Sequence, residues 1–185
     1  MSRPAVFLDR DGTLNAEKNY LHRIEDWEWL SGVIEAISII NQMGYLAIVV
    51  TNQAGIARGY YSEDEVRKLH RQVDKILAGE GSWIDAYYYC PHHPNYGNDQ
   101  NCNCRKPKPG MLLQATADFN IDLDKSFMIG DKALDIFAGI SAGVTPILVA
   151  TGYGLHESEL VSPTVLRAPN LFEASKLLPS LQNRV

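Results

Sequence analysis

Short apolar runs alternate along this chain with longer stretches in which apolar residues recur every three or four positions. The first run, residues 5–8, reads Ala-Val-Phe-Leu and ends at the polar turn sequence Asp-Arg-Asp-Gly. Continuous apolar runs bounded by turn residues are typical of buried strands, and a spacing of three or four residues is typical of helices with one apolar face. The pattern therefore predicts strands and helices in alternation.

The predicted elements follow one another as far as residue 149. Strands are expected at 5–8, 45–50, 85–90, 127–129 and 145–149, and helices at about 31–43, 62–77, 109–119 and 133–142. Ser62 and Glu65 have the spacing of a capping box, and Pro109 suits the first turn of a helix. The strand at 145–149 is expected to close the series, and a further helix near 171–178 is expected to pack on the sheet without an assigned function.

Strands that alternate with helices favour an α/β fold, a doubly wound and mostly parallel sheet sandwiched by helices. The chain has 185 residues and is 45% hydrophobic, so residues 1–185 are expected to form a single domain around one core. Its formal net charge of −5 offers no basic surface for nucleic acid. No stretch approaches the roughly 20 apolar residues that a membrane span requires. We therefore expect a cytoplasmic monomer without nucleic-acid or membrane partners.

Polar or small residues stand at the carboxyl ends of the predicted strands, where such sheets bind their ligands. Asp9 and Asp11 follow the first strand, Thr51 and Asn52 the second, and Gly130 and Asp131 the fourth. Carboxylates that share a site repel one another unless a cation joins them, and oxygen ligands suit Mg²⁺. Lys106 adds a cation for a phosphoryl group, and the Thr51 hydroxyl adds a hydrogen-bond donor. This set predicts metal-assisted phosphoryl chemistry.

Each of these residues also has an ordinary structural interpretation. Asp-Gly is a common turn sequence, and threonine and asparagine often end strands. Asp131 and Asp135 are also compatible with the start of a helix, where acids are favoured, and Lys106 taken alone would be a solvated surface residue. These separate interpretations do not explain why all of these residues occur together in positions that suit one phosphoryl site.

A second cluster of candidate ligands lies between the third strand and the next helix. Cys90-Pro-His92-His93 and Cys102-Asn-Cys104 supply three thiolates and an imidazole, a tetrahedral set for structural zinc. The polar residues 95–101 between them cannot fold by packing, so a metal would order the loop. His93 competes with His92 as the imidazole ligand, and a disulfide or reduced thiols are the alternatives to zinc.

Taken in order along the chain, these residues resemble the four motifs of the haloacid dehalogenase (HAD) superfamily. The motifs are Asp9-Arg-Asp11-Gly-Thr13, Thr51-Asn52, Lys106, and Gly130-Asp131 with Asp135. The resemblance implies that Asp9 attacks phosphorus to form an aspartyl-phosphate and that Asp11 acts first as acid and then as base. It implies that Thr51 and Lys106 hold the phosphoryl group. It also implies Mg²⁺ bound by the Asp9 side chain, the Asp11 backbone carbonyl and the Asp131 side chain.

The cysteine loop, about residues 90–109, narrows the resemblance to one family within the superfamily. Cys-Pro-His-His-Pro and Cys-x-Cys-Arg-Lys-Pro-x-Pro-Gly resemble the D-glycero-D-manno-heptose 1,7-bisphosphate 7-phosphatases, which are related to the histidinol-phosphate phosphatases. In these phosphatases the first histidine of the pair is the zinc ligand, so the resemblance implies His92 rather than His93. It implies a cap-less enzyme in which Arg105 contacts the distal part of the substrate and Lys106 the scissile phosphoryl group, while Lys132 lies beside phosphate and metal. The sugar pocket would be lined by Glu17, Lys18, Asn19, Tyr20, Thr51, Asn52, Gln53 and Ala54.

One departure from the superfamily pattern concerns the metal. Some members carry two adjacent acids where this chain has Asp131 and Lys132. A second acidic ligand is therefore missing at that position, and Asp135 is expected to support the site without binding the metal directly.

The resemblance implies a phosphatase that removes the 7-phosphate of a heptose bisphosphate in ADP-heptose and lipopolysaccharide core biosynthesis. Histidinol phosphate or another small phosphomonoester is the alternative substrate, and Arg105 favours a doubly phosphorylated one. The non-enzyme alternative is a phospho-acceptor signalling domain, which also places acids, a threonine and a lysine at strand ends. Asp11 disfavours that alternative, because a signalling domain must keep its phosphate and an acid-base group would release it.

Overall fold

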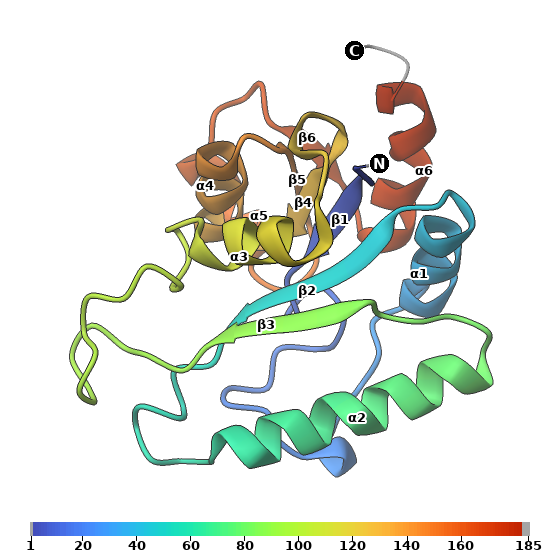
Figure 1. Ribbon diagram of the computed structural model, residues 1–185. Helices are drawn as coiled ribbons and strands as arrows, with labels where there is room; N and C mark the ends of the chain where they lie inside the picture. Colours follow the sequence, from blue (N-terminus) through green and yellow to red (C-terminus); the bar gives the residue numbers. More distant parts are fainter. Residues whose placement is uncertain (1, 183–185) are drawn as a thin grey trace.

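The computed structural model describes residues 2–182, whose strands form one parallel sheet (Figure 1). The strands are β1 (Ala5–Leu8), β2 (Leu46–Asn52), β3 (Ala86–Cys90), β4 (Phe127–Gly130), β5 (Thr145–Val149) and β6 (Leu166–Ala168). Their order across the sheet is β3-β2-β1-β4-β5-β6, so the order reverses between β1 and β4. Residue 1 and residues 183–185 of the expected domain lie outside the described residues.

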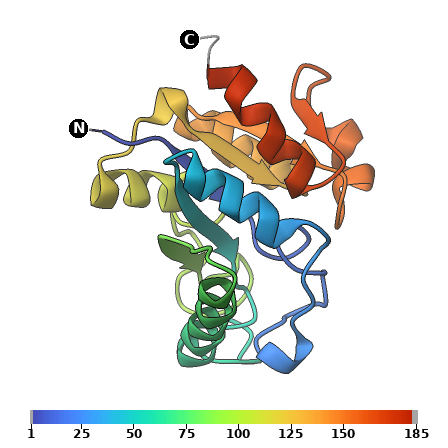
Figure 2. The same ribbon diagram turned by 90° about the vertical axis from the view of Figure 1, so that its right-hand side faces the viewer.

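Helices cover both faces of this sheet (Figures 1 and 2). They are α1 (Val33–Gln42), α2 (Glu63–Gly79), α3 (Gly110–Phe119), α4 (Ala133–Ala142), α5 (Gly154–Glu157) and α6 (Leu171–Gln182). The connection from β1 to α1 and the segment 91–109 contain no separate cap domain. The expected doubly wound, cap-less α/β fold is therefore confirmed.

The alternation of side chains along β1 explains why the sheet has two cores. Val6 and Leu8 are fully buried on the face that α1, α2 and α6 cover, whereas Ala5 and Phe7 are fully buried on the face of α3 and α4. Successive side chains of a strand point to opposite faces, so a run of four apolar residues feeds both cores. The central strand is thus fixed from both sides up to the residue that precedes Asp9.

Most of the predicted elements are present at the expected places, and the capping box starts α2 as expected. The Ser62 hydroxyl accepts a hydrogen bond from the Glu65 backbone N–H at 3.3 Å, and the Glu65 carboxylate accepts one from the Ser62 N–H at 2.8 Å. The prediction that the strand at 145–149 is the last was wrong, because β6 extends the sheet by one edge strand. Three residues at a sheet edge contain no apolar run that sequence reading could detect.

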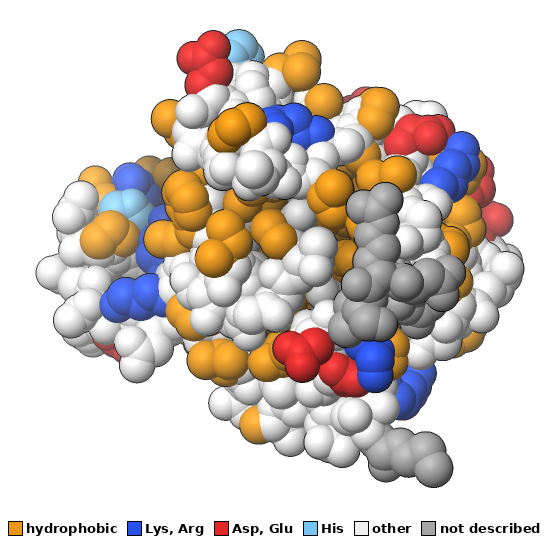
Figure 3. Space-filling model, turned by 90° about the horizontal axis from the view of Figure 1, so that it is seen from above, with side chains coloured by type: hydrophobic (Ala, Val, Ile, Leu, Met, Phe, Trp, Pro, Cys, Tyr) orange, Lys and Arg blue, Asp and Glu red, His pale blue; other side chains and the backbone are white. Residues whose placement is uncertain are grey.

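The helix expected near 171–178 is confirmed as α6. Its buried residues Leu171, Ala174 and Leu178 join the core that also contains α1. The described residues include no helix with the length and apolarity to cross a membrane. On the face seen in Figure 3, basic and acidic side chains are interspersed with apolar and uncharged ones.

Candidate active site

Three carboxylates meet where the strand order reverses. Asp9 directly follows β1 and Asp131 directly follows β4, and the Asp9 N–H donates to the Ile129 carbonyl at 2.9 Å. Asp135 comes from the first turn of α4. One ligand atom from each of the three carboxylates lies within 4.8 Å of the others, and all three side chains are buried. The adjacent parallel strands therefore bring together acids that are more than 120 residues apart in sequence.

The electrostatics of this cluster fit a bound divalent cation. Burial, followed by the negative charge of Asp9, raises the pKa of Asp131 to about 8. One Asp131 oxygen accepts a hydrogen bond from the Tyr153 N–H at 2.8 Å, whereas the other is buried without a hydrogen-bond partner. Buried carboxylate oxygens are normally paired or bound to metal. A bound Mg²⁺ would be the partner of the unpaired Asp131 oxygen, and its positive charge would offset the repulsion among the three carboxylates.

Glycine backbone lets the turn after β1 approach Asp131 closely. Gly12 has a φ of 88°, a left-handed conformation, and a Cβ added to it would collide with the Asp131 carboxylate. A Cβ on Gly152 would meet the same carboxylate. Both positions need glycine because two loops pack directly on one acid.

Lys106 reaches into this cluster from the segment that precedes α3. Its ammonium lies 2.7 Å from an Asp9 oxygen and 2.6 Å from an Asp135 oxygen, and it donates to the Val50 carbonyl at 2.7 Å. Burial alone would lower the pKa of Lys106, but the charges of Asp135 and Asp9 raise it. The interpretation of Lys106 as a solvated surface residue was wrong, since only 2% of the residue is exposed.

The backbone around Lys106 is held by Asn52 at the end of β2. The Asn52 side chain donates to the Lys106 carbonyl at 3.1 Å and accepts from the Lys106 N–H at 3.0 Å. This pair of hydrogen bonds attaches the 91–109 segment to the strand that also carries Thr51. The Thr51 oxygen accepts a hydrogen bond from Gln53 at 2.9 Å, so its own hydrogen is available to a ligand.

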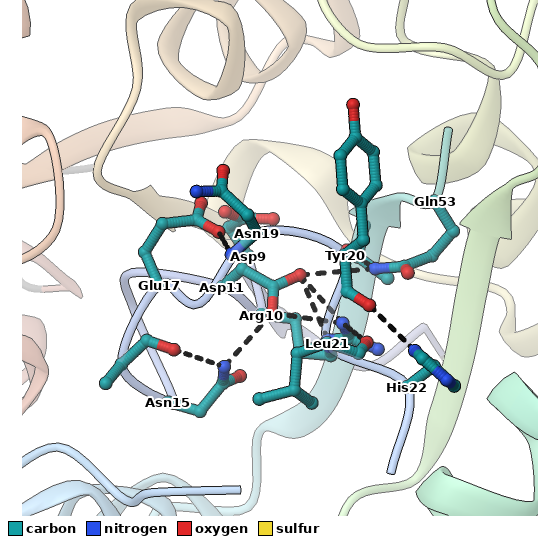
Figure 4. A network of polar contacts seen from close by, with 12 residues as sticks. Asp9, Arg10, Asp11, Asn15, Glu17, Asn19, Tyr20, Leu21, His22 and Gln53 are labelled. Carbon is teal, nitrogen blue, oxygen red and sulfur yellow. Dashed lines mark hydrogen bonds and ion pairs between the residues drawn. The ribbon is translucent and has the colours of Figure 1, made fainter. Parts of the chain in front are cut away.

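Asp11 lies at the centre of a network of donors (Figure 4). Its two oxygens accept from Arg10 at 3.1 and 3.0 Å, from Asn15 at 3.0 Å and from Gln53 at 3.2 Å. Tyr61 donates in turn to the Gln53 side chain at 2.6 Å. Burial opposes the ionised form of Asp11, but the charge of Arg10 and the hydrogen bond from Asn15 outweigh it and lower the pKa. The network therefore favours the carboxylate form before a substrate arrives.

These groups border a cavity of about 390 Å³. It is lined by Asp9, Asp11, Glu17, Asn19, Tyr20, Thr51, Asn52, Gln53, Ala54, Tyr61, Arg105, Lys106, Lys132, Leu134, Tyr153 and Glu157. Of the residues predicted from sequence to contact substrate, Lys18 does not line it. The Lys18 ammonium instead pairs with the Glu28 carboxylate at 2.9 Å, and both side chains are largely exposed.

Sequence reasoning missed four lining residues, namely Tyr61, Leu134, Tyr153 and Glu157. Two of them, Tyr153 and Glu157, belong to the segment 151–185 for which the sequence indicated no role. A usable signal was present, because Thr151 to Gly154 follow the carboxyl end of β5 just as the recognised motifs follow other strands. Tyr61 and Leu134 carry no such signal.

The part of the cavity wall formed by Glu17, Asn19 and Tyr20 has an unusual backbone. Asn19 and Tyr20 have φ values of 43° and 61°, both left-handed, although neither is glycine. Glu17 pairs with Lys132 across the cavity at 2.9 Å, and the Lys132 ammonium lies 4.8 Å from the centre of the Tyr153 ring. Strained backbone of this kind is often found at binding sites.

The cysteine cluster forms a second candidate site at the end of β3. One ligand atom from each of Cys90, His92, Cys102 and Cys104 lies within 4.8 Å of the others, and the three cysteines are free thiols. The sulfur atoms of Cys90 and Cys104 are 3.0 Å apart, and those of Cys90 and Cys102 are 3.6 Å apart. Zinc–sulfur bonds of about 2.3 Å place tetrahedral ligand atoms roughly 3.8 Å apart, so this donor set suits zinc.

His92, the imidazole of this cluster, also connects it to the cavity. Its Nδ1 lies 3.3 Å from the Cys104 sulfur, whereas His93 contacts Arg58 and Tyr96 outside the cluster. The Arg105 guanidinium donates to the His92 carbonyl at 3.1 Å and lines the cavity. A metal held by His92 would therefore fix the position of a cation in the cavity.

Known proteins resemble this chain along nearly its full length. The HAD-hydrolase-like family model matches residues 103–174. The D-glycero-beta-D-manno-heptose-1,7-bisphosphate 7-phosphatase of Pasteurella multocida is 45% identical over 182 residues, which are 94% of this chain and 99% of the relative. The Vibrio cholerae protein of the same name is 47% identical over 170 residues, which are 90% of this chain and 91% of the relative.

Solved structures give the same picture. The D,D-heptose 1,7-bisphosphate phosphatase of B. bronchiseptica, complexed with magnesium and phosphate, superposes with a TM-score of 0.87 at 30% identity, covering 96% of this chain and 99% of that one. The enzyme from Burkholderia thailandensis superposes with a TM-score of 0.73 at 27% identity, with coverage of 96% and 99%.

Proposed function

Because the chain belongs to the D-glycero-beta-D-manno-heptose-1,7-bisphosphate 7-phosphatase family of HAD-like hydrolases, we propose that it removes the 7-phosphate of this sugar bisphosphate. The observation that supports this most directly is the buried cluster of Asp9, Asp131 and Lys106, of which Asp9 and Lys106 border a cavity with further cations. The acids and Lys106 suit one phosphoryl group. Arg105 and Lys132 suit the second.

We propose Asp9 as the nucleophile. Its carboxylate borders the cavity, and the ion pair with Lys106 at 2.7 Å holds it in place. An Asp9 oxygen forms a bond to phosphorus while the bond between phosphorus and the sugar oxygen breaks, which gives an aspartyl-phosphate. The negative charge of the bound phosphorylated substrate favours protonation of Asp11, which then supplies this proton to the departing sugar oxygen. Water then attacks phosphorus, Asp11 takes its proton, and inorganic phosphate leaves.

The other residues of the site bind the group in transfer. The Thr51 hydroxyl and the Lys106 ammonium donate to the phosphoryl oxygens and stabilise the charge spread over them. Asp135 holds Lys106 in place at 2.6 Å, as expected for a supporting residue. The side chains of Asp9 and Asp131 and the Asp11 carbonyl would hold Mg²⁺, which would supply positive charge to offset the repulsion between carboxylate and phosphate.

Two residues of the cysteine loop, Arg105 and Lys106, line the cavity. Arg105 lies on this loop and is anchored to the backbone of the ligand His92. We propose that it binds the phosphate at position 1, while residues 17–20 and 51–54, apart from Lys18, surround the sugar. The proposal includes a monomeric, cytoplasmic, single-domain enzyme of lipopolysaccharide core biosynthesis without nucleic-acid or membrane partners.

A panel of phosphate esters tests this function. Magnesium-dependent phosphate release is measured with heptose 1,7-bisphosphate, fructose 1,6-bisphosphate and histidinol phosphate. The expected result is a kcat/KM for the heptose that exceeds the others by about tenfold or more. Arg105 would contact a second phosphate, which histidinol phosphate lacks, and the residues around the sugar would select between the two bisphosphates. A preference for histidinol phosphate would leave the chemistry intact and contradict the substrate. Absence of any release would contradict a phosphatase.

A further inference from the structure

Tyr61 lines the cavity just before α2 and has no part in the proposed reaction. It is buried, and its hydroxyl donates to the side-chain oxygen of Gln53, also buried, at 2.6 Å. The side-chain nitrogen of Gln53 donates to the Thr51 hydroxyl oxygen at 2.9 Å. The same nitrogen donates to Asp11 at 3.2 Å, the contact drawn in Figure 4. The amide is therefore held by a donor at its oxygen and by two acceptors at its nitrogen.

The partners fix the direction of each hydrogen bond in this chain of groups. The Asp11 carboxylate only accepts, so it faces the amide nitrogen of Gln53 and leaves the amide oxygen to the Tyr61 hydroxyl. The Thr51 oxygen accepts from the same nitrogen, so the Thr51 hydrogen points away from Gln53. Because Thr51 lines the cavity, this hydrogen can be donated to a phosphoryl oxygen there.

The ring of Tyr61 is closely packed. His22 stacks on it with the ring centres 4.8 Å apart and the planes 15° from parallel. Gly55 lies so near that an added Cβ would collide with the ring and its hydroxyl, so the loop has no side chain where the ring needs room. Apolar groups of the same shape can replace both partners of a buried hydrogen bond at little cost. Packing alone therefore needs neither the hydroxyl nor the amide.

We propose that Tyr61 is a positioning residue whose hydrogen bond holds the Gln53 amide where it directs the Thr51 hydroxyl hydrogen at the phosphoryl group in transfer. This rests on the proposed function, in which Thr51 binds that group. Without the Tyr61 donor the buried Gln53 oxygen has no partner, so the amide is no longer held against Thr51. The Thr51 hydrogen is then no longer directed into the cavity.

The first test is Tyr61→Phe, which keeps the ring and removes only the hydroxyl. We expect kcat/KM in the presence of Mg²⁺ to fall about five- to tenfold on heptose 1,7-bisphosphate. The loss should be the same on p-nitrophenyl phosphate, because both esters carry the group that Thr51 binds. Tyr88→Phe is the control, since it loses an equally short hydrogen bond, to Asp118 at 2.6 Å, and Tyr88 does not line the cavity. It should leave both activities unchanged.

A double-mutant cycle with Thr51→Val shows whether Tyr61 acts through Thr51. Thr51→Val keeps the shape of the side chain and removes its hydroxyl, and we expect kcat/KM to fall about 10²-fold. Adding Tyr61→Phe to Thr51→Val should lower kcat/KM by less than about a further twofold, because no Thr51 hydrogen remains to be directed. Two residues that act independently would instead give losses that multiply.

Gly55→Ala is a second variant that reaches the same hydrogen bond without removing a hydroxyl. Its added methyl group would push the Tyr61 ring away from Gln53. It should lower kcat/KM in the wild-type background and have little further effect on Thr51→Val. If Tyr61→Phe does not fold, this variant is used in the cycle under the same criterion.

Losses that multiply in the cycle, or wild-type kcat/KM in Tyr61→Phe, would overturn the proposal. Wild-type protein that hydrolyses p-nitrophenyl phosphate but not the heptose would contradict only the proposed substrate, and the cycle on p-nitrophenyl phosphate would still decide the role of Tyr61. Wild-type protein that hydrolyses neither ester would contradict the proposed function and, with it, this role.

Discussion

The two candidate metal sites, the carboxylate cluster and the cysteine cluster, are built in different ways. The acids of the first follow strands in the centre of the sheet, and Asp9, Asp131 and Asp135 are at most 5% exposed. The second is held by residues 91–109, which contain no helix or strand and are largely exposed between His93 and Asn101. Backbone pairing positions the first set of ligands, whereas the second needs a metal to bring its ligands together.

The two sites meet at adjacent residues. Lys106 belongs to the carboxylate cluster and Arg105 to the cysteine loop, and Asn52 fixes the backbone between them to β2. We infer that the sheet positions the residues that take part in the chemical step, whereas the metal-ordered loop positions residues that select the substrate. Variants of each site should therefore fail in different ways.

The largest effect is expected from the carboxylate cluster. Asp9→Asn removes the nucleophile and should lower kcat by about 10⁴-fold or more. Because the backbone of β1 is unchanged, the circular dichroism spectrum should remain that of wild type. Phosphate release is the measurement, and Asp124→Asn, at an exposed aspartate far from the cavity, is the control. Substantial activity in Asp9→Asn would contradict a covalent mechanism.

The second-largest effect on activity is expected from the cysteine loop. Cys102→Ser should lower the zinc content and reduce kcat/KM for heptose bisphosphate by about 10- to 100-fold, since Arg105 loses its anchor. The main thermal unfolding transition should change little, because the sheet forms without the loop. Asn98→Ser, in the same exposed loop, serves as control. Full activity in a wild-type protein that contains no zinc would contradict the role given to this loop.

A smaller and more selective effect is expected at Arg105. Arg105→Gln should raise KM for the bisphosphate by about tenfold and leave kcat within about twofold, because the residue would bind the distal phosphate equally before and during reaction. A monophosphate that lacks the second group should be unaffected. Steady-state kinetics on both substrates separates these outcomes. An equal loss of kcat on both substrates would place Arg105 in the chemical step.

The smallest effect is expected at Lys18, which pairs with Glu28 away from the cavity. Lys18→Gln should change KM by less than about twofold, since exposed ion pairs contribute little. Asn19→Ala, at the neighbouring residue that lines the cavity, should change it more. A larger effect at Lys18 would show that the 17–20 loop rearranges when substrate binds.

Much of the fold and the chemical part of the site could be predicted from the sequence. Motifs such as Asp9-x-Asp11 and Asp131 stand directly after apolar runs, so periodicity alone locates them at strand ends. The candidate zinc ligands could be recognised because three cysteines fall within fifteen residues. Such close spacing of cysteines, with a histidine among them, is typical of metal sites.

Contacts that depend on side-chain direction could not be predicted in this way. Lys18 was grouped with the cavity because its neighbours in sequence line it, but its side chain points to Glu28. Tyr61 and Leu134 line the cavity although neither stands directly after a predicted strand, so no local sequence signal marks them. The bidentate contact of Arg10 with both Asp11 oxygens likewise depends on side-chain direction.

The most direct test of the central claim is to identify which phosphate leaves. Heptose 1,7-bisphosphate is incubated with the protein and Mg²⁺, and the ³¹P spectrum of the sugar is followed to completion. The account predicts that the resonance of the 7-phosphate is replaced by that of inorganic phosphate while the 1-phosphate remains. Loss of the 1-phosphate, or a spectrum that does not change, would contradict it.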